Sequence, residues 1–265
     1  MILTLEREDL ELFSFIFGAV IGSFLNVLIS RLPQGLSIVT PRSFCPSCKK
    51  TIPWYYNIPL ISYIFLKAKC GFCKEKIPAS YFIVELLSAC LTLVFFIKFS
   101  LSYEFFISIT LFYILLTLSF IDFKYKAVPD YLLLMVLVLS FFVTTQSLFE
   151  AFKSAFIFSG AFVLLNFVLT FYVQNIKSRI TKNESLKTQE ALGEGDIPIL
   201  AMMAVVLGVK AAIIAVFLAS IFAIIPSIYS SFIKKDVQTP FIPYLVLGFY
   251  VEYFFVLEDF LKVSI

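Results

Sequence analysis

The chain has 265 residues, of which 60% are hydrophobic and 15% charged, and its mean hydropathy is +0.97. Its charges are grouped between long apolar runs, which excludes an amphipathic soluble bundle and indicates a polytopic protein of the lipid bilayer. Because the chain has no histidine, Ser-His, Cys-His and His-metal mechanisms are excluded. The net charge of +3, shared among several loops, argues against nucleic-acid binding.

Eight apolar segments are candidates for membrane helices, which need about 20 residues each. In chain order they are Leu12 to Ser30, Ile77 to Ile97, Phe105 to Ile121, Tyr131 to Phe149, Ser154 to Ile176, Ile197 to Val209, Ala211 to Ile233 and Val237 to Leu257. We therefore predict an all-α polytopic membrane protein with about eight transmembrane helices. The predicted parts are the N-terminal segment with the first helix (1–30), a four-cysteine subdomain (31–80) and a transmembrane domain (81–265).

Lysine and arginine determine the predicted orientation, because cytoplasmic loops are enriched in both residues. With the N-terminus outside, the cytoplasmic segments hold 16 of the 21 basic residues. The sequence therefore predicts that both termini lie outside. The N-terminal residues are mostly acidic, unlike the basic start of a signal peptide, so we expect the first helix to be retained. The predicted cytoplasmic segments are 31–80, 123–129, 177–195 and 234–236.

Segment 31–80 is the one stretch predicted to form a small soluble subdomain. It contains the pairs Cys45-Pro-Ser-Cys48 and Cys70-Gly-Phe-Cys73, with 21 residues between them, a spacing close to that of a four-cysteine zinc ribbon. Disulfides are disfavoured in the cytoplasm, and a bound metal would fold a loop too small to build its own core. The pattern favours a structural zinc site, with redox-active thiols or unrelated cysteines as alternatives.

Four carboxylates lie in or beside apolar segments, where a charge is costly: Glu85, Asp122, Asp130 and Asp196. Asp122 ends the third segment, at the negative end of a helix dipole. Asp196 follows Gly193-Glu-Gly195, whose glycines permit turns closed to other residues, and we expect Asp196 to cap the next helix. We interpret Asp130 as the cap of the fourth segment. Glu85 is interpreted as a residue that orients the site or pairs with a loop cation.

The predicted topology brings Asp122 and Asp196 to the same cytoplasmic border from separate helices. Two adjacent carboxylates cannot both ionise easily, and the resulting acid and base can polarise a carbonyl group and activate water for peptide hydrolysis. The alternative is that Asp122 is a border charge paired with Lys124 or Lys126, and that Asp196 is only a helix cap. Their occurrence on one face, in a chain without histidine, favours catalysis.

At these residues the sequence resembles the type IV prepilin peptidase family, the bifunctional leader peptidases of bacterial pilus and type II secretion systems. Gly193-Glu-Gly195-Asp196 matches the family's glycine-x-glycine-aspartate motif, and Ile121-Asp122, followed by Pro129-Asp130, resembles its first catalytic motif. Three further segments, Gly18 to Pro33, Ile52 to Pro59 and Pro240 to Gly248, are similar to the first span, the region between the cysteine pairs and the last span. The resemblance extends through nearly the whole chain.

The resemblance implies an aspartic endopeptidase in residues 81–265, with Asp122 and Asp196 as its catalytic residues. It implies removal of a short basic leader from prepilins or pseudopilins, after a glycine, at the cytoplasmic face of the bacterial inner membrane. Members with the four-cysteine domain commonly also methylate the new N-terminus with S-adenosylmethionine, although this sequence has no glycine-rich cofactor loop. We expect Asp196 to start as the anion and Asp122 as the acid.

Two positions depart from the family pattern. Pro198 stands where the family usually has Lys, and Ile242 stands where the last span usually has Gly between its prolines. A non-catalytic assembly scaffold that keeps the fold is therefore one alternative function. An ion-coupled transporter is another, although it would be expected to show inverted repeats and acids near the middle of the membrane. The oligomeric state is left open.

Overall fold

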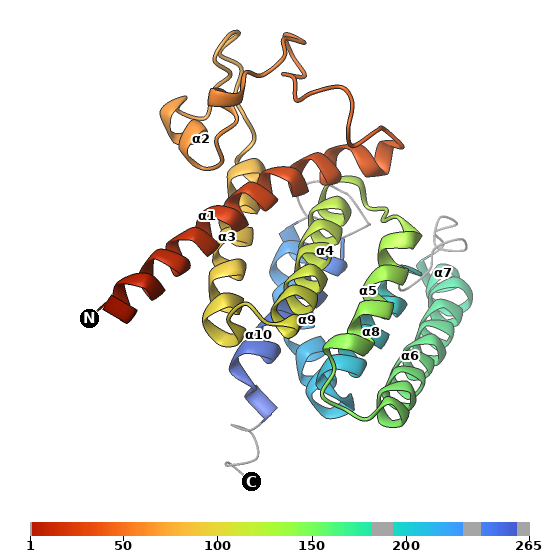
Figure 1. Ribbon diagram of the computed structural model, residues 1–265. Helices are drawn as coiled ribbons and strands as arrows, with labels where there is room; N and C mark the ends of the chain where they lie inside the picture. Colours follow the sequence, from red (N-terminus) through yellow and green to blue (C-terminus); the bar gives the residue numbers. More distant parts are fainter. Residues whose placement is uncertain (1, 182–192, 230–239, 259–265) are drawn as a thin grey trace. The chain divides into compact units, whose positions relative to one another are not determined.

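The computed structural model describes residues 2–181, 193–229 and 240–258, and these residues form helices with two isolated β-bridges in one connecting segment (Figure 1). The chain divides into two compact units, residues 1–121 and 122–265. The predicted domain boundaries after residues 30 and 80 stay predictions. The predicted cytoplasmic segment 234–236, and residues 182–192 of another, lie outside the described residues.

In the first unit, two long helices pack closely because α1 presents glycines to α3. A Cβ atom added at Gly18 or Gly22 would overlap side chains of α3, at Thr92 and Ser88 respectively. Small residues four positions apart allow two helix backbones to approach each other, as in many membrane helix pairs. The helices of this unit are α1 (Ile2–Arg31), α2 (Ile61–Phe65), α3 (Ala79–Phe99) and most of α4 (Tyr103–Tyr125), with short 3-10 turns η1 (Leu32–Gln34) and η2 (Trp54–Tyr56).

The second unit is built around α8, a short apolar helix that packs against α5, α6, α9 and α10. Every residue of α8 from Ile199 to Val206 is buried. Because α8 carries Asp196 at its first residue, the helices around it also surround the candidate site. The helices of this unit are α5 (Asp130–Val143), α6 (Leu148–Phe171) with its π-helical continuation η3 (Tyr172–Lys177), α7 (Ser178–Thr181), α8 (Asp196–Leu207), α9 (Val209–Tyr229) and α10 (Ile242–Phe255).

Helices occur in all eight predicted apolar segments, but not all are long enough to cross a bilayer. Among the described residues, five helices (α1, α3, α4, α6 and α9) are long and apolar enough, whereas α5, α8 and α10 have 14, 12 and 14 residues. At about 1.5 Å per residue these three are roughly 18–21 Å long, shorter than a hydrocarbon core of about 30 Å. Five helices are therefore candidate membrane spans by length and composition, and the count of eight crossings stays a prediction.

One predicted boundary is wrong. The segment predicted to continue from Tyr131 to Phe149 ends as a helix at Val143, and a turn separates it from α6. Thr144 takes an extended conformation, and the side chain of Ser147 accepts the backbone N–H of Glu150 as the N-cap of α6. Polar side chains that bond to the backbone favour caps and turns over helix interiors, which explains the break within an apolar stretch.

The contact between α9 and α10 depends on Gly248. A Cβ atom at Gly248 would overlap the carbonyl oxygen of Ala215 and would lie 3.1 Å from the backbone nitrogen of Ala219. Backbone atoms of a helix cannot move aside as a flexible side chain can. Gly248 therefore determines how closely α10, whose first turn reaches the candidate site, approaches α9.

We expect Gly248→Ala to lower the thermal unfolding midpoint of the detergent-solubilised protein, because overpacking of a tight contact typically costs about 1–3 kcal/mol. Gly160→Ala in α6 is the matched control, since an added Cβ there meets no atom within 4 Å. Alanine is about 1 kcal/mol better than glycine within a helix, so the control should keep or raise the midpoint. Equal midpoints for the two variants would contradict the close approach.

Candidate functional site

The four predicted metal-ligating cysteines converge in the first unit. The Sγ atoms of Cys45, Cys48, Cys70 and Cys73 all lie within 4.8 Å of one another. The Sγ atoms of Cys45 and Cys73 are 3.8 Å apart. Sulfur atoms at about 2.3 Å from a tetrahedral zinc ion lie about 3.8 Å from each other, whereas a disulfide brings them to about 2.05 Å. The four thiols therefore fit a metal ion.

Each cysteine pair lies on the same type of tight turn, closed by one of the two β-bridges. In each turn the first cysteine donates its backbone N–H to the residue five positions later and accepts an N–H from the residue four positions later, at 2.8–3.1 Å. The residue four positions later has a left-handed backbone in both turns. The bonds are Cys45 N to Lys50 O, Lys49 N to Cys45 O, Cys70 N to Glu75 O and Lys74 N to Cys70 O.

Backbone N–H groups of these turns also favour thiolates. Hydrogen bonds from the backbone N–H groups of Cys73 and Phe72 lower the pKa of Cys70 to about 6. The backbone N–H of Cys48 lowers the pKa of Cys45 in the same way. The thiolate is the form of cysteine that binds metal, so the turns favour Cys45 and Cys70 as ligands. Despite an opposing backbone hydrogen bond, burial and the neighbouring cysteines instead raise the pKa of Cys73 to about 11.

Glu85 lies in α3 and fastens the cysteine-containing segment to that helix. Its Oε2 accepts the backbone N–H of Leu60 at 2.8 Å, and the side chain of Ser23 is a second partner. Among the described residues, the loop group that contacts Glu85 is therefore a backbone amide. Glu85 belongs to the first unit, whereas Asp122 and Asp196 both belong to the second.

Asp122 lies in the last turn of α4 and is 7% exposed. Its Oδ2 accepts the backbone N–H of Ile242 at 3.2 Å, and the backbone N–H of Phe241 also bonds to the carboxylate. These amides lie at the start of α10, where backbone N–H groups have no partner within the helix and the dipole favours an anion. The start of α10 thereby offsets the unfavourable dipole of the helix that carries Asp122.

Asp196 is the first residue of α8 and is 6% exposed. We expected Asp196 to be the helix cap, but Gly195 occupies that position and makes no side-chain cap. The backbone of Gly195 is already helical, so the first turn begins one residue earlier than expected. The carboxylate of Asp196 instead accepts the backbone N–H of Gly193.

Of the two glycines of this motif, Gly195 is the one favoured by space, and neither has an unusual backbone. Neither Gly193 nor Gly195 has a positive φ, so the expectation of turns closed to other residues is wrong. A Cβ atom at Gly195 would lie 3.0 Å from Cγ2 of Val128. One at Gly193 would lie 3.5 Å from Oδ2 of Asp196. The absent side chain of Gly195 therefore leaves room for Val128, whereas an added Cβ at Gly193 would make an ordinary contact with the carboxylate.

Asp122 and Asp196 are brought together within the second unit. Their carboxylates are close enough for the charge of Asp122 to act on Asp196 and also on the hydroxyl of Tyr244 in the first turn of α10. Two buried carboxylates in this situation do not both ionise easily. A pair of this kind can supply both a general acid and a general base.

Two other predicted residues have simpler positions. Asp130 is exposed at the first residue of α5, and Pro129 takes the cap position, so the prediction that Asp130 caps this helix is wrong. Pro198 lies in the first turn of α8, as predicted, where its missing N–H removes no hydrogen bond of the helix.

Sequence reasoning missed the start of α10 as part of the site. Phe241 and Ile242 contribute backbone atoms, which side-chain motifs do not reveal, and Tyr244 contributes a hydroxyl near Asp122. Pro243 was the signal in the sequence that could have revealed the start of α10, because proline favours the first positions of a helix. The start of a helix is where backbone N–H groups lack partners within the helix.

Comparisons with known proteins agree with this arrangement of motifs. The family model described as Bacterial Peptidase A24 N-terminal domain matches residues 16–99, and the one described as Type IV leader peptidase family matches residues 109–228. No solved structure gives a significant match.

Several curated relatives carry the name prepilin leader peptidase/N-methyltransferase. The protein of Vibrio cholerae is 32% identical, over 94% of this chain and 98% of its own length. The protein of Bacillus subtilis is 29% identical over 91% and 92%, and that of Myxococcus xanthus is 34% identical over 72% of this chain and 54% of its own length. With similarity of this extent, and with both family models matched in order along the sequence, the chain belongs to the Type IV leader peptidase family.

Proposed function

We propose that this chain is a membrane aspartic endopeptidase that removes the leader from type IV prepilins or pseudopilins and also methylates the new N-terminus. Membership of the family and the names of its relatives support the substrate class and the second activity. S-adenosylmethionine is the proposed methyl donor. The proposed location is the bacterial inner membrane, with about eight crossings, both termini outside and the site at the cytoplasmic border, as the distribution of Lys and Arg predicts.

The observation that carries the peptidase proposal is the buried pair of Asp122 and Asp196. Both carboxylates lie at helix ends in a unit whose interior is mainly apolar and also buries Glu252 of α10. A charge in such a place is expensive and needs specific partners. Backbone N–H groups at the start of α10 and at Gly193 supply those partners. Peptide hydrolysis by paired carboxylates explains why two acids are kept there.

The hydrogen bonds favour a division of roles opposite to the one expected from sequence. Asp122 accepts two backbone N–H groups at the start of α10, and Asp196 accepts one. We propose that Asp122 starts as the anion, which removes a proton from the attacking water. Asp196 then starts as the acid and polarises the carbonyl oxygen of the bond to be cut. Because the two groups titrate as a pair, the roles describe its favoured protonation state.

The four cysteines are proposed to hold a structural zinc ion. When bound, the ion would cross-link the two tight turns of a segment too small to stabilise itself by core packing. The hydrogen bond between Glu85 and Leu60 joins this segment to α3. The proposed role of the zinc is therefore to stabilise the segment and not to take part in hydrolysis.

Asp122→Asn and Asp196→Asn should each abolish leader cleavage in membranes, with losses of about a thousandfold or more, because an amide cannot take part in the proton transfers. Glu150→Gln is the matched control, since Glu150 is an exposed carboxylate on α6 that pairs with Lys153. Mass spectrometry of the product N-terminus would show the cleavage position and the added mass of a methyl group. Parental activity in either Asn variant would contradict the mechanism, and an inserted but inactive parent would favour the scaffold or transporter.

Purified protein should contain one zinc ion per chain, and Cys45→Ser should lose most of it, because one of four ligands is removed. Cys90→Ser is the control, since Cys90 lies in α3 outside the cluster and should not affect zinc content. Metal analysis by mass spectrometry provides the measurement. A parent protein without metal would refute the zinc proposal.

A further inference from the structure

The packing of α8 specifies only weakly where this helix lies along its own axis. Its sequence after Asp196 contains no polar side chain, and its neighbours present mainly apolar surfaces. Apolar contacts are non-directional, and methionine adapts its shape readily, so packing alone specifies an axial position weakly. Both Met202 and Met203 are fully buried in this helix. Something else must therefore determine how far Asp196 projects toward Asp122.

The end of α8 opposite Asp196 provides directional contacts. The side-chain Nε2 of Gln146 donates to the carbonyl oxygens of Ala204 and Val205, at 3.0 and 2.7 Å. The hydroxyl of Thr144 donates to the same oxygen of Val205, at 2.5 Å. The last carbonyl groups of a helix lack the next turn's N–H groups, and inside a membrane protein each needs a partner. The carbonyl oxygen of Ala204 also accepts the backbone N–H of Gly208, whereas that of Val205 is bonded by the side chains of Gln146 and Thr144. The α5–α6 turn thus acts as a side-chain cap for α8.

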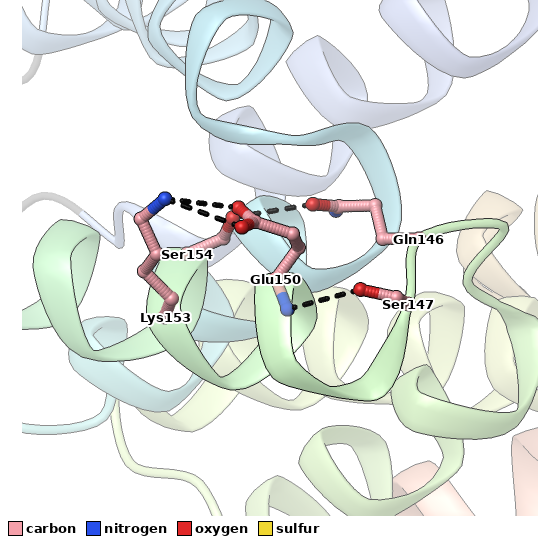
Figure 2. A network of polar contacts seen from close by, with 5 residues as sticks. All are labelled: Gln146, Ser147, Glu150, Lys153 and Ser154. Atoms are coloured by element: carbon pink, nitrogen blue, oxygen red, sulfur yellow. Dashed lines mark hydrogen bonds and ion pairs between the residues drawn. The ribbon is translucent and has the colours of Figure 1, made fainter.

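The capping side chain is itself held in place. Gln146 donates its backbone N–H to the hydroxyl of Thr144 at 3.1 Å, and its Oε1 accepts a hydrogen bond from Ser154 of α6 at 3.2 Å. Figure 2 shows Gln146 extending from the turn before α6 and Ser154 reaching it from the helix. The amide is therefore oriented by its oxygen, with its nitrogen directed to α8.

We propose that Gln146 is a positioning residue for peptide hydrolysis, which fixes the axial position of α8 and thereby the placement of Asp196 beside Asp122. Val205 lies nine residues after Asp196, about 14 Å along the helix. A shift of α8 by one residue, about 1.5 Å, would move both carbonyl groups away from Gln146 and Thr144. It would also displace the carboxylate of Asp196 by the same distance. This inference rests on the proposed peptidase function.

Gln146→Met tests it, because methionine keeps the approximate length of glutamine but cannot donate a hydrogen bond. We expect kcat for leader cleavage to fall about tenfold or more, with KM close to that of the parent, because small misplacements of reacting groups are costly. Lys153→Met is the matched control: it removes the exposed ion pair with Glu150 in the same part of α6 and leaves α8 untouched. The control should retain the parental kcat and KM.

A second readout does not depend on activity. A Cβ at Gly195 would lie 3.0 Å from Cγ2 of Val128, so the pair Val128→Cys and Gly195→Cys should form a disulfide when α8 is in place. Adding Gln146→Met should slow formation of this disulfide, as measured by mass spectrometry of linked peptides. Should Gln146→Met fail to fold, Thr144→Val, which removes one bond to Val205, should show the same two effects.

Folded Gln146→Met protein with parental kcat and parental disulfide formation would overturn the inference. A lower thermal midpoint together with parental kcat would also overturn it, because that is the result of a purely structural role. If the parent cuts no prepilin, the proposed function fails, and the rate of disulfide formation still decides whether Gln146 positions α8.

Discussion

A carboxylate buried among apolar helices can ionise only if hydrogen-bond donors replace the water it has lost. In this protein the first turn of α10 supplies those donors to Asp122 through the backbone N–H groups of Phe241 and Ile242. Asp122 and Ile242 lie 120 positions apart in the sequence. The remaining features of the second unit can be understood as ways of keeping α10 and α8 in the positions that this interaction requires.

Close helix packing is the main means of holding these positions. Gly248 allows α10 to lie against the backbone of α9, and Gly195 leaves room for Val128 at the start of α8. At the other end of α8, Gln146 and Thr144 bond to the carbonyl group of Val205, and Gln146 also bonds to that of Ala204. Directional bonds therefore lie at the ends of α8, and apolar packing lies between them. The catalytic proposal requires this combination, because the carboxylates must approach each other to share a proton.

The sequence predicted features that depend on short-range patterns. The cysteine spacing predicted the convergence of four Sγ atoms, and the run from Gly193 to Asp196 predicted a helix start carrying a carboxylate. It did not predict the break at Thr144 or the capping of α8 by Gln146, because an apolar run hides a turn whose polar partners lie about 60 residues away. It also assigned a conformational role to Gly193 and Gly195, since the motif alone does not distinguish a positive φ from a need for space such as that of Gly195.

The central claim is that Asp122 and Asp196 act as one unit with one shared proton. The most direct test is the residual rate of leader cleavage by the Asp122→Asn/Asp196→Asn double variant, compared with the two single variants in the same membranes. Residues that act as a unit are strongly non-additive, so the double variant should retain about the same residual rate as either single variant. If the losses in the two single variants instead multiply in the double variant, the carboxylates act independently and the account of a coupled pair is wrong.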